Sequence, residues 1–74
     1  MEYTVLIHAA EEGGYWAEAP ALPGCFSQGE TLDEALANVR EAIELHLESL
    51  RDEGQEVPRD AGFVIGRVEV SDVP

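Results

Sequence analysis

The stretch that decides the fold is residues 31–54, TLDEALANVREAIELHLESLRDEG. It opens with a capping box, in which the Thr31 hydroxyl accepts a hydrogen bond from the Glu34 N–H and the Glu34 carboxylate reaches back. Gly54 suits the residue after a helix end. Between these signals, apolar residues recur at steps of three and four, the spacing of one helix face: Leu32, Leu36, Val39, Ile43, Leu47 and Leu50. The sequence therefore predicts one long helix over Leu32–Arg51.

Three segments before this helix have the composition of strands. Residues 2–10 alternate and contain Tyr, Thr, Val and Ile, and residues 15–19 and 25–28 read as two shorter strands. The sequence Glu11-Glu12-Gly13-Gly14 predicts a hairpin turn, because glycine readily takes positive φ. The two prolines of residues 20–24 predict a rigid loop. After the helix, residues 63–70 predict a fourth strand.

The resulting order, βββαβ, predicts an α+β fold in a single domain spanning residues 1–74. We expect a four-stranded mixed sheet of order 3-2-1-4, with the last strand parallel to the first and the helix on one face. The last strand has apolar residues on both of its sides. Since one helix covers only one face, we expect the other face or an edge to meet a second chain, in a homodimer or a higher homo-oligomer.

Charge is the strongest signal in the composition. The chain has 16 Asp and Glu against 4 Lys and Arg, for a net charge of −12. Such a chain repels phosphate backbones and anionic lipid, so we expect no direct nucleic-acid binding and no membrane association. A basic protein partner would be attracted, although the charge also fits a simple role in solubility. A single cysteine and the absence of a basic leader predict a cytoplasmic location.

The residue types and their spacings do not indicate a catalytic or metal-binding site. His8, His46 and Cys25 lack the clustered spacing of zinc ligands. The carboxylates concentrate in the hairpin turn and on the polar side of the helix, and residues 4–8 of the first strand contain none. We therefore expect a binding module that is not an enzyme and that uses no metal or cofactor. Trp16 is either a core residue or an interface anchor beside Glu18.

Four sequence pieces in order resemble the HicB antitoxin family: GGYWAEAP at 13–20, LPGC at 22–25, QGETLDEAL at 28–36 and REAI at 40–43. The resemblance implies the βββαβ order of a reduced ribonuclease H fold without that enzyme's active site. It also implies a partner, HicA, a small basic RNA-cleaving toxin whose catalytic histidine the antitoxin covers. Many members continue into a C-terminal DNA-binding domain. This chain ends four residues after the last predicted strand, so we expect no promoter binding.

The resemblance also suggests residues for the partner surface. Carboxylates placed where phosphates would lie, with an apolar anchor to exclude water, can silence an RNA-binding surface. The candidates are Glu11, Glu12 and Glu18 for charge, and Trp16, Leu22 and Pro23 for the anchor and its loop. Two functions stay open. One is an antitoxin that neutralises a small basic HicA-like toxin, and the alternative is a stand-alone oligomeric scaffold or regulator with another protein partner.

Overall fold

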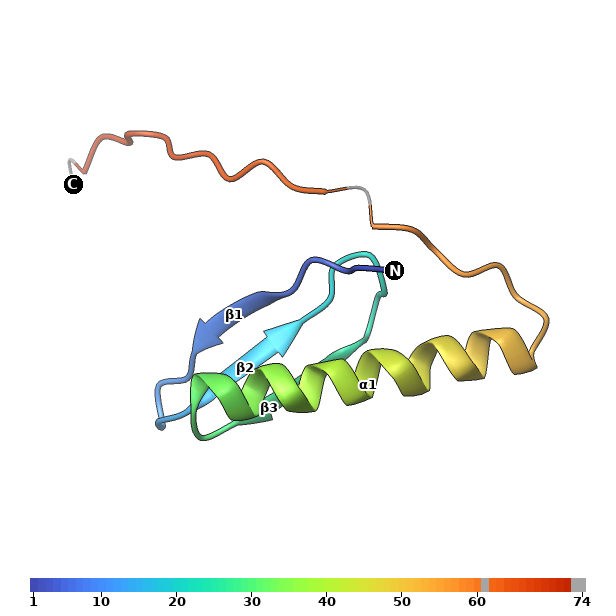
Figure 1. Ribbon diagram of the computed structural model, residues 1–74. Helices are drawn as coiled ribbons and strands as arrows, with labels where there is room; N and C mark the ends of the chain where they lie inside the picture. The colour runs from blue at the N-terminus through green and yellow to red at the C-terminus, as the bar shows by residue number, and fades with distance from the viewer. Residues whose placement is uncertain (61, 73–74) are drawn as a thin grey trace.

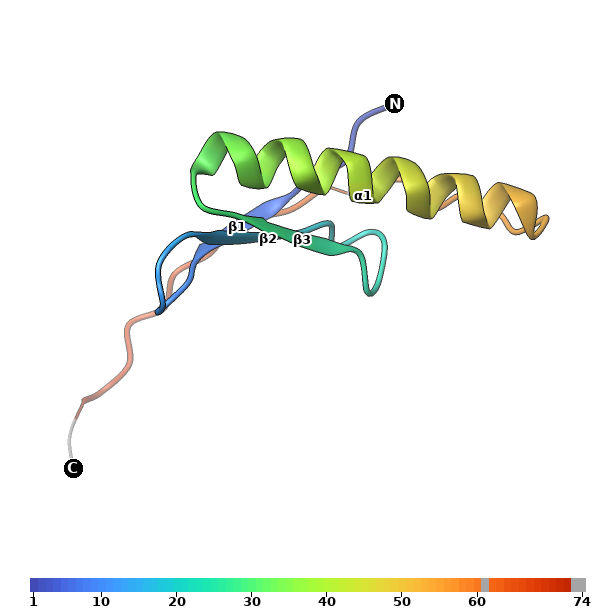
Figure 2. The same cartoon turned by 90° about the horizontal axis from the view of Figure 1, so that it is seen from below.

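The structure, a computed structural model, describes residues 1–60 and 62–72. Within them, three strands precede one helix: β1 (Leu6–Ala9), β2 (Tyr15–Glu18), β3 (Phe26–Gly29) and α1 (Leu32–Asp52). The strands form an antiparallel meander of order β1-β2-β3, and α1 lies across one face of it (Figures 1 and 2). The predicted α+β class, the first three strands and the helix are confirmed.

The start of α1 follows the predicted capping box with one difference. The Thr31 hydroxyl accepts from the Glu34 N–H at 3.1 Å, as expected. The Glu34 carboxylate reaches back to the residue before the N-cap and accepts from the Glu30 N–H at 3.3 Å, whereas a standard capping box uses the N-cap N–H. Both bonds satisfy backbone donors that the first helical turn leaves without partners, so they fix where the helix begins.

The core lies between α1 and the strand residues that point toward it. On β2, Ala17 is fully buried, and Ala35 and Val39 of the helix are buried against the sheet. Gly29 allows this close approach, because a Cβ there would lie 2.5 Å from the Ala35 backbone nitrogen. Asn38 of α1 also donates to the Gln28 carbonyl oxygen at 2.7 Å. Small residues at this contact therefore let the helix dock directly on β2 and β3.

The predicted apolar stripe of α1 is only partly covered. Leu47 and Val39 are buried as expected, but Leu32 and Leu36 expose 47% and 39% of their surface. The reason is the width of the sheet: three short strands do not extend under the whole first half of the helix. A strip of apolar helix surface is left beside β1.

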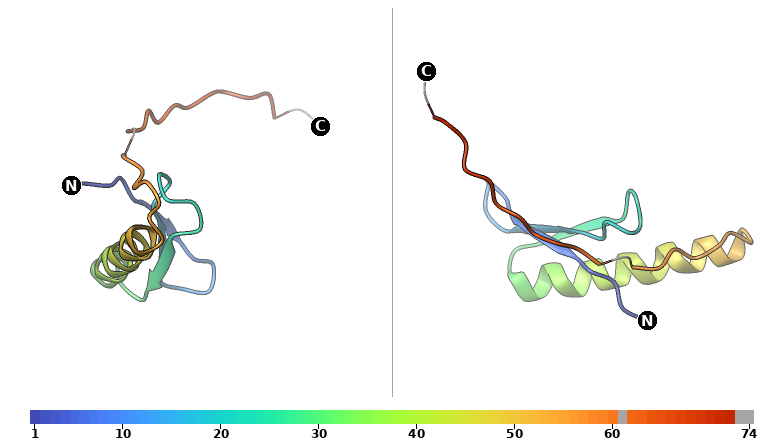
Figure 3. Two further views of the ribbon diagram at one scale, coloured as in Figure 1. Left: turned by 90° about the vertical axis from the view of Figure 1, so that its right-hand side faces the viewer. Right: turned by 90° about the horizontal axis from the view of Figure 1, so that it is seen from above.

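The C-terminal segment differs from the predicted fourth strand. Residues 63–70 form no strand in the structure, and β1 has β2 as its strand partner among the described residues. The connector is tied to the chain before β1, since Tyr3 donates to the Pro58 carbonyl and Thr4 donates to Asp60 at 2.7 Å. Beyond Gly62, which has a φ of +78°, the chain runs away from the body on the β1 side (Figures 1 and 3).

Candidate protein-binding face

The sheet face opposite α1 carries the candidate functional residues. Residues paired across an antiparallel sheet point to the same side. The pairs Leu6–Glu18, His8–Trp16, Trp16–Gln28 and Glu18–Phe26 therefore place all these residues on one face. Ala17, one residue from Trp16, points the other way into the core. We call the surface of Leu6, His8, Trp16, Glu18, Phe26 and Gln28 the open face.

Trp16 is the centre of the open face. It exposes 38% of its surface, so it is not a core residue. Its indole stacks on the His8 imidazole, with ring centroids 4.0 Å apart and planes 15° from parallel. His8 in turn places Nε2 2.7 Å from a carboxylate oxygen of Glu18. Since an ionised carboxylate only accepts hydrogen bonds, His8 is the donor, and the three side chains form one connected group.

Phe26 enlarges the apolar part of this face. It exposes 66% of its surface and lies opposite Glu18 in the register. Sequence reasoning missed both Phe26 and His8 as candidate site residues. The signal that finds them is the strand pairing: once Trp16 is known to face away from the helix, its register partners must do the same.

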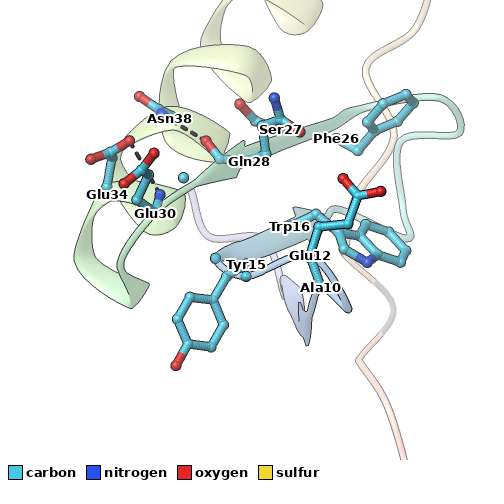
Figure 4. Close-up of a pocket in the computed structure, with 13 residues that line it drawn as sticks. Ala10, Glu12, Tyr15, Trp16, Phe26, Ser27, Gln28, Glu30, Glu34 and Asn38 are labelled. Atoms are coloured by element: carbon cyan, nitrogen blue, oxygen red, sulfur yellow. Dashed lines mark hydrogen bonds between the residues drawn. The ribbon is translucent and has the colours of Figure 1, made fainter.

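A hollow of about 1140 Å³ adjoins the open face and continues around the β1–β2 turn to the start of α1. Trp16, Phe26 and Glu12 line it together, and in Figure 4 the Glu12 carboxylate lies beside the Trp16 ring. Gly13, Gly14 and Gly29, which have no side chains, also line the hollow. A surface with exposed aromatic side chains, a carboxylate and accessible backbone suits a protein partner better than a small apolar ligand.

The acidic turn is built as predicted. The Ala10 N–H donates to Gly14 at 3.0 Å and the Gly13 N–H donates to Ala10 at 3.1 Å, which closes the hairpin. Both glycines have positive φ. Glu11 and Glu12 are exposed at its tip, so two of the predicted charged residues project at the end of the sheet, and Glu18 lies on the open face itself.

The two loop residues predicted to contact a partner, Leu22 and Pro23, differ in exposure. The loop closes on itself through the Ala19 N–H to Cys25 bond at 3.0 Å and the Cys25 N–H to Leu22 bond at 3.0 Å. This fold-back turns Leu22 inward, where it is fully buried and packs with Ala19, Cys25 and Leu47. Leu22 therefore supports the loop from beneath and offers no surface to a partner, which corrects its assignment as a contact. Pro23 is exposed at the tip.

The residues with metal-binding or nucleophilic chemistry do not converge. In residues 1–60 and 62–72, no group of three or more His, Cys, Asp or Glu side chains is placed to hold a metal ion. Cys25 is 5% exposed in the core cluster. Its burial raises the pKa of the thiol, which keeps it protonated and unreactive. His8 is engaged with Trp16 and Glu18.

The sequence matches a family described as HicB-like antitoxin of bacterial toxin–antitoxin systems, over residues 3–69. The chain belongs to this family. Among curated relatives, it is 52% identical over 60 residues to the UPF0150 protein Ta0767 of Thermoplasma acidophilum, covering 81% of this chain and 87% of that protein. It is 53% identical over 58 residues to the UPF0150 protein ssr1765 of Synechocystis, covering 78% and 73%.

Solved structures of HicB antitoxins have the same fold. The Burkholderia pseudomallei antitoxin HicB matches with a TM-score of 0.74 and 36% identity, over 85% of this chain and 48% of that one. This HicB-like chain thus spans about half of that antitoxin. A chain of the HicA3 and HicB3 toxin–antitoxin complex matches with a TM-score of 0.66 and 34% identity, over 78% of this chain and 66% of that chain.

No helix in the described part of the chain has the length and apolar character needed to cross a membrane.

Proposed function

We propose that this HicB-like protein is an antitoxin that neutralises a small, basic, HicA-type RNA-cleaving toxin by covering its active surface. The open face carries the proposal: it presents Trp16 and Phe26 to solvent beside the Glu18 carboxylate. Exposed aromatic residues on a sheet face are typical anchors of protein interfaces. Membership of the family and the likeness to a chain of a toxin–antitoxin complex support the same role.

The charge distribution favours a basic partner. The chain has a net charge of −12, and the hairpin turn that borders the open face carries Glu11 and Glu12. An RNA-cleaving toxin must itself attract phosphate, so its active surface is basic. Carboxylates at the rim steer such a surface into place, while the aromatic residues exclude water at the centre. The protein acts in this proposal by occlusion and performs no chemistry.

The proposed function is tested with a purified HicA-type toxin. Purified toxin is assayed for RNA cleavage with increasing amounts of the HicB-like chain. Inhibition that saturates at a fixed molar ratio, together with a co-purifying complex, is expected. Unchanged cleavage at a large excess of the chain would contradict the proposal and favour the alternative, a scaffold or regulator with a different protein partner.

We also propose that the protein self-associates. A domain of 74 residues buries only about 60% of the surface that its unfolded chain exposes. This one leaves Val64, Ile65, Val68 and Val70 almost fully in solvent. A second copy is the partner always present to cover them, and closed two-fold dimers are the commonest form of such assembly.

A further inference from the structure

The C-terminal arm, residues 62–72, is an extended segment without cover from its own chain. Phe63 keeps 48% of its surface in solvent, and Val64, Ile65, Val68 and Val70 keep between 79% and 96%. The whole chain has a radius of gyration of 15.2 Å, against about 11 Å expected for a compact chain of this length. Figures 1 and 3 show the arm projecting on the β1 side of the sheet. Val64, Ile65, Val68 and Val70 are β-branched residues, which suit a strand.

The sheet presents a matching docking site. In the structure as described, β1 is the end of the sheet and has β2 on one side. Next to it lies a groove of about 390 Å³ between the chain leading into β1 and the first half of α1. Its apolar lining comes from Tyr3 and Val5 on one wall and from Leu36, Val39 and Ile43 on the other. A strand added at β1 would fill this groove with every second side chain.

The path of the chain favours a second copy as the donor of that strand. Tyr3 and Thr4 hold the connector at Pro58 and Asp60, at the entrance to β1. The chain passes this edge, and beyond Gly62 its residues are exposed and lie apart from β1 (Figure 3). The arm therefore does not fill the groove beside β1 of its own chain, although its exposed apolar side chains could fill such a groove. If two copies related by a two-fold axis exchange their arms, each arm is buried and each groove is filled.

We propose that two copies exchange their C-terminal arms, so that the arm of each docks as a fourth strand on the β1 edge of the other and covers the groove lined by Leu36 and Ile43. The exchange deepens the proposed self-association by naming its surface. It leaves the open face uncovered, because the added strand lies beside β1 and not over Trp16. Toxin binding and arm exchange are therefore separate events with separate tests.

The decisive experiment mixes copies of the full chain labelled with ¹³C and ¹⁵N with unlabelled copies and records isotope-filtered NOEs. Light scattering of the same sample is expected to give twice the 8.1 kDa mass of one chain. Contacts between labelled Val64, Val68 or Val70 methyl groups and unlabelled groove residues support exchange. A mass of one chain at millimolar concentration would overturn it, and so would groove contacts found only within one chain, which would mean that the arm folds back.

A pair of variants tests the arm without relying on NMR. Val68→Asp places a carboxylate where the arm is proposed to be buried, and we expect the dimer dissociation constant to rise at least tenfold, or about 1.4 kcal/mol. Leu45→Asp makes the same charge change at an exposed helix residue and should leave the dimer unchanged. Circular dichroism confirms that α1 persists in both. Equal dissociation constants for the two variants would contradict arm exchange.

Discussion

The His8 imidazole stacks on the Trp16 indole, and this contact lies on the open face, outside the core of the chain. Because Trp16 keeps 38% of its surface in solvent, its removal leaves the packing under α1 intact. We expect Trp16→Ala to lower the free energy of unfolding by less than about 3 kcal/mol, because it loses the aromatic pair, about 0.5–1.5 kcal/mol, and only part of the apolar burial of the side chain. A core tryptophan would cost about 3–5 kcal/mol. Urea denaturation distinguishes the two.

The same variant tests the partner surface. If Trp16 anchors the partner, Trp16→Ala should weaken toxin binding by about 2 kcal/mol or more. Leu45→Ala, at an exposed residue of α1 away from the open face, is the control and should bind normally. Calorimetric titration measures both. Unchanged affinity in Trp16→Ala would remove the open face from the proposal.

Leu22, unlike Trp16, is fully buried. We expect Leu22→Ala to lower the free energy of unfolding by about 2–5 kcal/mol through the cavity it leaves. Pro23→Ala, at the exposed tip of the same loop, should change it by less than about 1 kcal/mol, mainly through the entropy of the unfolded chain. Thermal melting compares the two, and equal losses would argue against the inward position of Leu22.

Gly29 tests how closely α1 approaches β3. A Cβ at this residue would lie 2.5 Å from the Ala35 nitrogen and 2.7 Å from the Glu34 carbonyl carbon, both of which are backbone atoms. We expect Gly29→Ala to destabilise the fold by at least about 1–3 kcal/mol, because the helix must shift. A Gly29→Ala variant with native stability would contradict the close docking.

The sequence predicted the elements that local signals specify. The capping box set the start of α1, since the Thr31 hydroxyl needs only the Glu34 N–H three residues away. The glycines of the hairpin set the β1–β2 turn in the same way. The burial of Leu22 escaped prediction because it depends on how the Pro20–Gly24 loop folds back on Cys25. Residues 63–70, predicted as a fourth strand, form no strand in the structure, since no local signal says which edge, or which copy, such a segment meets.

The candidate site, too, was predicted only in part from the sequence. Glu11, Glu12 and Trp16 are accessible where the sequence suggested. Whether Trp16 lies in the core or on the surface depends on which face of the sheet α1 covers, since the strand alternation says only that Trp16 and Ala17 point to opposite faces. Phe26 becomes part of the open face only through its pairing with Glu18.

Cys25 should make the stability of the fold depend on pH. Burial raises the pKa of its thiol, so the native state holds this proton more tightly than the unfolded chain. Its contribution is complete below the ordinary thiol pKa of about 8.5 and is lost as the pH rises from there through the folded value. We therefore expect the urea midpoint of Cys25→Ala to fall less than that of the wild type between neutral and alkaline pH. Parallel declines in the two proteins would assign the loss to other groups.

The acidic turn yields a kinetic prediction. Glu11 and Glu12 are exposed at the tip of the β1–β2 hairpin, at the rim of the open face. Rim charges act mainly on the encounter between partners, whereas buried anchors act on dissociation. Replacing both, as Glu11→Gln with Glu12→Gln, should slow association with a basic toxin several-fold at low salt and leave dissociation unchanged. The effect should shrink as salt is added, because exposed charges are screened beyond about 10 Å at 0.1 M.

The control for this double variant is Glu41→Gln with Glu48→Gln, which removes the same charge from exposed helix residues. Both variants have the same net charge, so a general loss of long-range attraction would slow them equally. A larger loss in the hairpin variant locates the attraction at the turn, since Coulomb energy grows as charges approach. Stopped-flow association at several salt concentrations measures the difference, and equal rates for the two variants would place the toxin away from the acidic turn.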